Sequence, residues 1–111
     1  MLNLGTHPFA ETSLDRVIEL SYRLLGLISF LTAGPDEVRA WPIRDESTAV
    51  DAAGAIHSDL AKGFIRAEVV AYEDLLRFGS MAEARKHGRL RSEGRTYRVR
   101  DGDVLEILFS R

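Results

Sequence analysis

The feature that most constrains this chain is a change of hydrophobic period at Gly63. Over residues 51–61, small and apolar side chains recur at helical spacing, which predicts a helix with one buried stripe. Over residues 64–70, alternate residues are apolar, which predicts a strand with one apolar face. That face is expected to carry Ile65, Ala67 and Val69, and the mixed face Phe64, Arg66 and Glu68. We expect Gly63 to end the helix in the left-handed conformation, which glycine adopts at least cost.

The other segments predict a small domain of mixed helices and strands. They are a helix at 14–26, strands at 27–33 and 38–44 around a turn, short helices at 72–78 and 81–86, and strands at 90–92, 96–99 and 104–109. Pro42 places the second strand near a sheet edge, because proline cannot donate to the ladder. A hairpin crossed by a helix and joined by returning strands is an α+β domain of the β-grasp (ubiquitin-like) type. We expect a mixed sheet with one main helix on one face and the other face open, plus the N-terminal helix.

Composition excludes several classes of function. The chain of 111 residues fits one domain, and the absence of cysteine excludes disulfides, thiolate metal sites and cysteine nucleophiles. The three histidines have no metal-ligand spacing, so we expect no metal, and no cofactor motif is present. We find no signal peptide, and the apolar run at 24–33 is too short for a membrane span, so a cytoplasmic protein is expected.

Basic residues concentrate in the second half of the chain. Residues 1–60 carry 4 Lys/Arg against 9 Asp/Glu, whereas residues 61–111 carry 11 against 8. The densest group is Arg85, Lys86, Arg89, Arg91, Arg95, Arg98 and Arg100. If Leu90, Tyr97 and Val99 point inward, these cations lie outward together, as a patch suited to RNA phosphates. The alternative is an ordinary solvated charged face.

A second candidate surface combines aromatic and arginine side chains. Arg39 and Trp41 share a parity on one predicted strand, as do Phe64 and Arg66 on another. If both pairs face the open side of the sheet, they form a platform for stacking on a base or packing a partner. The alternative is that Trp41 belongs to the core and that Arg66 and Glu68 pair with their neighbours.

A third candidate lies where the helix at 51–61 ends. His57, Asp59 and Lys62 could grip a phosphate or nucleotide, or His57 could cap the helix while the other two stay solvated. We find no catalytic residues: Ser58 lies beside His57 and Asp59 but has no oxyanion-hole motif. An independent enzyme is therefore not expected.

Several motifs resemble one known family. They are Leu-Leu-Gly-Leu-Ile-Ser-Phe at 24–30, Glu-Val-Arg-Ala-Trp at 37–41, Ile-His-Ser-Asp at 56–59, Lys-Gly-Phe-Ile-Arg-Ala-Glu-Val at 62–69 and Asp-Gly-Asp-Val at 101–104. In this order, over about residues 14–111, they resemble the C-terminal domain of the YchF family, the Obg-like ATPases. That domain is similar to the TGS domains of threonyl-tRNA synthetases and Rel/SpoT-type enzymes. The resemblance implies a β-grasp fold and a binding or regulatory role in translation, in a family of ribosome-associated P-loop ATPases.

The sequence also departs from that family. It has no Gly-x-x-x-x-Gly-Lys-Ser/Thr, and Pro42 stands where the family usually has Thr, as Val50-Asp51 stands for Pro-Gln. The chain is either a stand-alone relative or a fragment, and its initial Met and first 12 residues favour a stand-alone gene. We expect an arm at 1–13 and a TGS-like domain at 14–111.

Three functions are open at this point. The first is a TGS-type module that contacts RNA or the ribosome. The second is a protein-interaction domain that docks on a separate P-loop NTPase through its N-terminal helix and hairpin. The apolar stripe of that helix, at 14–25, could instead cover the domain's own core. The third is a sensor of a small nucleotide or alarmone near His57, Lys62 and Arg66. The sequence gives no indication of the oligomeric state.

Overall fold

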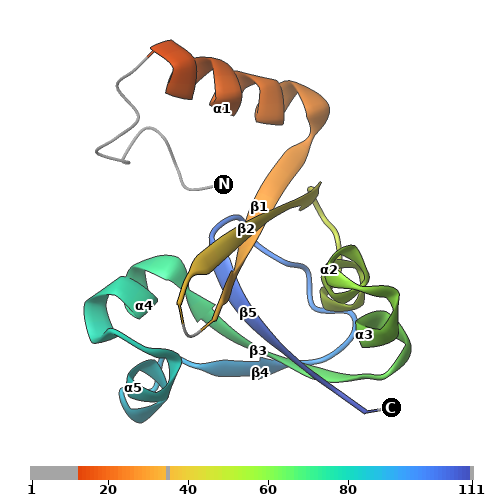
Figure 1. Ribbon diagram of the computed structural model, residues 1–111, viewed down its shortest axis with the longest axis vertical. Helices are drawn as coiled ribbons and strands as arrows, with labels where there is room; N and C mark the ends of the chain where they lie inside the picture. The colour runs from red at the N-terminus through yellow and green to blue at the C-terminus, as the bar shows by residue number, and fades with distance from the viewer. Residues whose placement is uncertain (1–12, 35, 111) are drawn as a thin grey trace.

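The computed structural model describes residues 13–34 and 36–110, so all but the last residue of the expected arm at 1–13 lies outside the described residues. Its elements are α1 (Ser13–Leu25), β1 (Leu27–Ala33), β2 (Val38–Arg44), α2 (Ala49–Ile56), α3 (Ser58–Lys62), β3 (Phe64–Ala71), α4 (Tyr72–Phe78), α5 (Met81–Lys86), β4 (Arg91–Glu93) and β5 (Asp103–Phe109) (Figure 1). The expected strand at 96–99 is wrong, because this segment is a loop with one isolated bridge between Thr48 and Arg98. Among the described residues, no helix is long and apolar enough to span a membrane.

The five strands form one mixed sheet in the order β2-β1-β5-β3-β4. β1 pairs with β2 as an antiparallel hairpin and with β5 in parallel, and β3 is antiparallel to both β5 and β4. A hairpin whose first strand lies beside the last strand, with a helix connecting to β3, is the β-grasp arrangement. The α+β fold expected from the sequence is therefore confirmed.

Helices cover both faces of the sheet. Successive residues of β3 and β5 point to opposite sides, so each face has its own set of buried residues. On one face the buried residues are Phe30, Ile43, Ala49, Ala52, Ala53, Phe64, Ala67, Val69, Val99 and Leu105, which include three residues of α2. On the other they are Val70, Leu75, Ala84 and Val104, which bring in α4 and α5. Figure 1 shows the two helix pairs on either side of the central strands. The expectation of one open face is wrong where α4 and α5 pack against it.

The main helix is broken into two at His57. Thr48 begins α2 with a capping box: its hydroxyl accepts a hydrogen bond from the backbone of Asp51, and the Asp51 carboxylate accepts one from the backbone of Thr48. His57 is extended, and its Nδ1 accepts a hydrogen bond from the Asp59 amide at 3.0 Å, which caps α3. A single helix at 51–61 was therefore wrong, because this cap starts a new helix.

Gly63 is required for close packing rather than for a left-handed turn. Its φ is −94°, so the expected left-handed cap is wrong. A Cβ at this position would overlap the backbone carbonyl of Ser110, whose carbon would lie 3.0 Å away. The Ser110 amide donates to the Gly63 carbonyl oxygen at 2.8 Å. The glycine therefore lets the end of β5 pass directly over the turn between α3 and β3.

A bulge at the start of β3 reverses the expected parity of its first residues. Phe64 pairs with Phe109, but the next pair is Arg66 with Leu108, so Ile65 is an extra residue. Phe64 is consequently buried at 5% exposure and Ile65 is 54% exposed. The assignment of Ile65 to the core face and Phe64 to the mixed face was wrong. Alternation is regular from Arg66 onward.

β2 is an edge strand, as Pro42 predicted. Pro42 lies opposite Ser29, whose amide donates to Asp101 Oδ1 at 2.9 Å and whose carbonyl accepts from the Gly102 amide at 2.9 Å. The backbone groups of Ser29 therefore point away from β2, and this is a pair without hydrogen bonds between its members. The Pro42 nitrogen consequently faces outward from the sheet, where no N–H is needed for the ladder.

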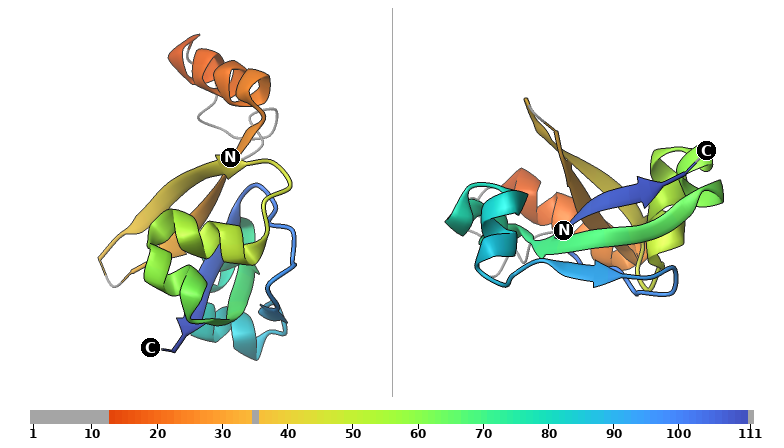
Figure 2. Two further views of the ribbon diagram at one scale, coloured as in Figure 1. Left: turned by 90° about the vertical axis from the view of Figure 1, so that its right-hand side faces the viewer. Right: turned by 90° about the horizontal axis from the view of Figure 1, so that it is seen from below.

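α1 projects away from the sheet, and the views agree on this (Figures 1 and 2). None of its residues is buried, and its apolar stripe is solvent-exposed. The exposed positions are Leu14, Val17, Ile18, Leu20, Leu24 and Leu25. Of the two interpretations of this stripe, cover for the domain's own core is therefore wrong.

Candidate functional site

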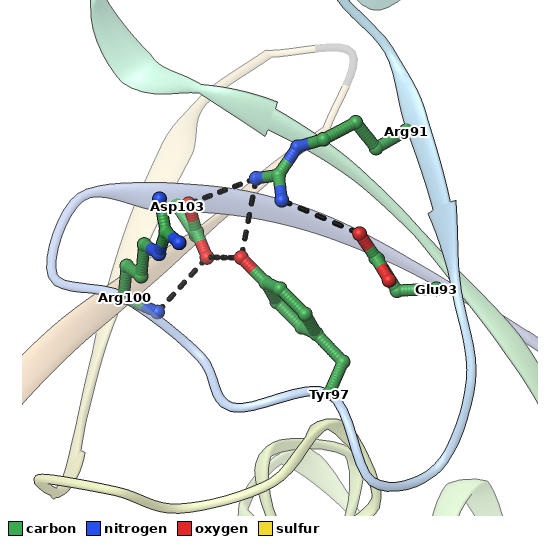
Figure 3. Close-up of polar contacts among 5 residues, drawn as sticks. All are labelled: Arg91, Glu93, Tyr97, Arg100 and Asp103. Atoms are coloured by element: carbon green, nitrogen blue, oxygen red, sulfur yellow. Dashed lines mark hydrogen bonds and ion pairs between the residues drawn. The ribbon is translucent and has the colours of Figure 1, made fainter.

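A hydrogen-bonded network fixes the loop at 94–102, hereafter the arginine loop, to the sheet (Figure 3). The Tyr97 hydroxyl donates to Asp103 Oδ2 at 2.5 Å, and the Arg100 amide donates to the same oxygen at 2.9 Å. Arg91 reaches in from β4, with Nη2 donating to the Tyr97 oxygen at 3.1 Å and lying 3.7 Å from Asp103 Oδ1. Its Nη1 donates to Glu93 at 3.3 Å. The network holds the loop that carries Arg98 and Arg100.

The charges in this network perturb two pKa values. Burial raises the pKa of Tyr97, and its hydrogen bond to the Asp103 carboxylate raises it further. Burial by itself would lower the pKa of Arg91, but the bond to Tyr97 and the carboxylates of Asp103 and Glu93 outweigh it, so the pKa is raised. Asp103 is buried at 4% exposure, with three donors around its carboxylate. The pattern is that of a structural anchor.

The raised pKa of Tyr97 predicts a loss of stability in alkali. The folded state favours the neutral phenol, so this contribution is full below the unfolded pKa of about 10 and disappears as pH rises through the higher folded value. We expect the free energy of unfolding to fall more steeply above about pH 10 in the wild type than in Tyr97→Phe. Urea unfolding at a series of pH values measures this. Parallel curves for the two proteins would contradict it.

The expected single patch of cations at 85–100 is wrong, because the fold divides it. Leu90 packs on the α4/α5 side of the sheet, whereas Tyr97 and Val99 pack on the α2 side. Arg85 accordingly bonds to the buried Glu68 at 2.7 Å, while Arg91 belongs to the Tyr97 network on the other side. The two groups face different surfaces.

Several of these cations are paired. Arg98 lies 3.0 Å from Glu46 and Lys86 3.3 Å from Glu83, and Arg95 lies over the Phe64 ring and donates to its carbonyl at 3.4 Å. Arg89 and Arg100 are exposed, and in the described part of the chain no carboxylate oxygen lies within 4.0 Å of either guanidinium. These two guanidinium groups are therefore available to contact a partner.

The aromatic platform forms only in part. The Arg39 guanidinium lies 4.3 Å above the Trp41 ring, which stacks on Phe30 with 6.4 Å between centroids, and Trp41 Nε1 donates to Thr32 at 2.9 Å. These residues lie on the α2 side of the sheet, with Trp41 packed against the core. Arg66 points to the opposite side, where its Nη2 lies 3.9 Å from Glu68 Oε1. The four predicted residues are therefore not one surface.

The polar cluster near His57 has a structural role. Nδ1 of His57 is used as the cap of α3, which confirms the capping interpretation. Lys62 is exposed and lines a shallow cavity of about 470 Å³ with Asp59, Gly63 and Ser110. Arg66 lies beyond the bulge, beside Glu68. The structure brings Lys62 and Asp59 to one hollow, but neither His57 nor Arg66 lines it.

Sequence reasoning missed the carboxylates that organise the arginines. The Asp-Gly-Asp at 101–103 predicts a turn, and in the structure its two carboxylates also fix β1 and the arginine loop. Glu68 was assigned to a mixed strand face, yet it is 8% exposed and anchors Arg85. A buried carboxylate needs a cationic partner. An acidic residue within a predicted strand of an arginine-rich domain could therefore have indicated a buried ion pair.

Comparison with known proteins agrees with the fold. The YchF-GTPase_C family model, described as a protein of unknown function (DUF933), matches residues 27–110. The ribosome-binding ATPase YchF of Bacillus subtilis is 53% identical over 100 residues, which are 90% of this chain and 27% of that protein. The YchF of Escherichia coli O157:H7 is 47% identical over 100 residues, which are 28% of it.

Solved structures of related proteins share this fold. The YchF GTPase of Schizosaccharomyces pombe superposes with a TM-score of 0.80 at 35% identity, over 87% of this chain and 26% of that one. A GTP binding protein of Pyrococcus horikoshii OT3 shares the fold, with a TM-score of 0.59 at 22% identity over 92% of this chain and 26% of that one. The chain spans about a quarter of the length of these relatives. It belongs to the YchF-GTPase C-terminal domain family.

Proposed function

We propose that this domain is a non-catalytic TGS-type regulatory module of translation, which acts in the cytoplasm and contacts ribosomal RNA. The support for the ribosome as partner is the family, whose relatives in Bacillus subtilis and Escherichia coli are named ribosome-binding ATPases. The support for a non-catalytic role is chemical, because the sequence contains no P-loop and its buried charged network is saturated internally. The chain would contribute recognition, and nucleotide hydrolysis would belong to a P-loop domain.

The single observation that carries RNA contact is the pair of arginines on the fixed arginine loop. Arg100 has no carboxylate partner among the described residues, and Arg98 has a weak one. The Arg98–Glu46 pair is exposed on both sides, at 70% and 75%, and exposed ion pairs contribute little. A phosphate can therefore replace Glu46 at small cost. Because the Tyr97–Asp103 bond fixes the loop, little conformational entropy is lost when RNA binds.

Cosedimentation with ribosomes at two salt concentrations tests the proposal. We expect the chain to bind at about 50 mM salt and to dissociate at about 200 mM, because counterion release makes phosphate contacts salt-dependent. In Arg98→Ala/Arg100→Ala, the slope of log affinity against log salt should flatten by about 1.4 to 1.8, for two lost contacts. The matched control is Arg16→Ala/Arg23→Ala on α1, which removes the same charge. Arg23 is paired with Glu19, and Arg16 has no carboxylate partner among the described residues. Binding that is independent of salt, or equal loss in both variants, would contradict the proposal.

A second candidate function rests on the exposed stripe of α1. Leu24 and Leu14 are 78% and 68% exposed, which is unusual for a helix with so marked an apolar side. We propose as the alternative that the stripe docks on a P-loop ATPase of the same family, which would then carry the ribosome contact. In that case the chain alone would not cosediment with ribosomes. Added ATPase would restore cosedimentation of the wild type but not of Leu24→Asp.

A further inference from the structure

The ends of α4 and α5 bring two rings into a surface stack, hereafter the ring stack (Phe78 and His87). Their centroids lie 4.3 Å apart with an interplanar angle of 15°. The turn that joins the helices makes this possible: Gly79 is left-handed at φ 86°, and Ser80 caps α5 by accepting from the Glu83 amide at 3.1 Å. The ends of the two helices are thereby held side by side.

The outer layer of the ring stack is the imidazole. Phe78 is half-buried and packs against the core on the α4/α5 side, whereas His87 is exposed. Nδ1 of His87 lies 2.9 Å from the Glu83 carbonyl oxygen, which can only accept, so Nδ1 carries the proton and fixes the ring plane. One face of the imidazole stacks on Phe78, and the residue as a whole is exposed. A flat, immobilised ring face is what an unpaired base stacks on.

Three basic residues adjoin the ring stack, one by contact and two by their position in the chain. The Arg77 guanidinium carbon lies 5.2 Å from the Phe78 centroid, and Lys86 and Arg89 flank His87 in the chain. All three are exposed, and no carboxylate oxygen of the described residues lies within 4.0 Å of the charged group of Arg77 or Arg89. Lys86 is paired with Glu83 at 3.3 Å across the helix surface. Positive charge at the rim of an exposed ring matches the alternating bases and phosphates of a single strand.

From this geometry we infer that the ring stack and its flanking cations form a second RNA-contacting site, specific for single-stranded RNA. A base stacks on the free face of His87, and Arg77 and Arg89 contact the phosphates on either side. The inference builds on the proposed function by taking RNA as the partner, but it uses a different surface and a different kind of contact. An acidic protein segment would use the cations but would gain nothing from the flat ring face, and this separates the two partners.

Fluorescence anisotropy with a short labelled oligouridine and the whole chain tests the site. His87→Ala should weaken binding about 5- to 150-fold, the range for loss of one stacked base, and His87→Phe should restore most of it. Arg89→Ala should lower the salt slope by about 0.7, as one single-strand phosphate contact does. The matched control is Arg44→Ala, an exposed cation on β2, which should change affinity less than either variant. Thermal melts establish that each variant is folded at the assay temperature.

Other results of these binding experiments would contradict the inference. His87→Ala that binds like Arg44→Ala, or His87→Phe that fails to restore binding, would overturn stacking on the ring. Polyglutamate that displaces the oligouridine as effectively as unlabelled RNA would reassign the surface to an acidic protein. A wild-type chain that binds ribosomes but not oligouridine would overturn this site and leave the proposed function standing. Binding to neither would overturn both.

Discussion

Replacing Asp103 by alanine is expected to cost about 3 kcal/mol of folding free energy, the range for breaking a buried charged network. The carboxylate is buried and accepts from the Tyr97 hydroxyl and the Arg100 amide, with the Arg91 guanidinium 3.7 Å away. Alanine leaves the Tyr97 hydroxyl and the Arg100 amide, both partly buried, without their acceptor, and it removes one of the carboxylates beside Arg91. Urea unfolding followed by circular dichroism measures the change.

Tyr97→Phe is the matched comparison for this prediction. It removes one hydroxyl but keeps the Asp103 carboxylate with the Arg100 amide bond and the nearby Arg91 guanidinium, so a loss of about 1 kcal/mol is expected. In the double variant the losses should be less than additive, since both changes break the same hydrogen bond. A loss below that of Tyr97→Phe in the Asp103 variant would mean that the network does not hold the arginine loop.

Gly63→Ala is expected to destabilise the domain by about 3 kcal/mol, the upper part of the range for overpacking. The added methyl group meets a backbone carbonyl, that of Ser110, rather than a side chain that can rotate away. To relieve the overlap, the end of β5 has to separate from the turn. That breaks the 2.8 Å bond from the Ser110 amide to the Gly63 carbonyl and weakens the pairing of Phe109 with Phe64.

Gly94→Ala is the control for this experiment. A Cβ at Gly94 meets no atom within 4 Å, so its effect should stay within about 0.5 kcal/mol. Thermal unfolding of the two variants gives the comparison. Hydrogen exchange should be faster at Ser110 in the Gly63 variant, because its amide has lost its acceptor. Equal stability of the two variants would refute the close approach of β5 to the turn.

The elements that follow from local periodicity were predicted well from the sequence. The α1 helix, the β1–β2 hairpin and the edge position set by Pro42 depend on spacing and on single-residue chemistry, which the sequence states directly. The predicted role of Gly63 was wrong because its environment depends on a distant part of the chain. Its position after a helix is compatible with a left-handed cap, and the close approach of Ser110 comes from a strand that is remote in sequence.

The candidate site was predicted less well, because its geometry depends on which face of the sheet each neighbour packs on. One extra residue at Ile65 moved Phe64 into the core, and strand alternation cannot anticipate a bulge. Leu90 is half-buried and Val99 is buried, as expected. They pack on opposite faces of the sheet, so the arginines near them are divided between two surfaces. The ring stack depends on the packing of α4 against α5, and the sequence of either helix alone does not predict that packing.

The outward-facing nitrogen of Pro42 has a consequence for how these molecules behave when crowded. The outer edge of β2 lacks one of the amide donors that an added strand would need. Another chain therefore cannot pair with β2 along its full length. The opposite rim, β4, is three residues long and offers little more. Both ends of the sheet therefore resist self-templated growth into fibres, and many copies can gather at high local concentration without joining edge to edge.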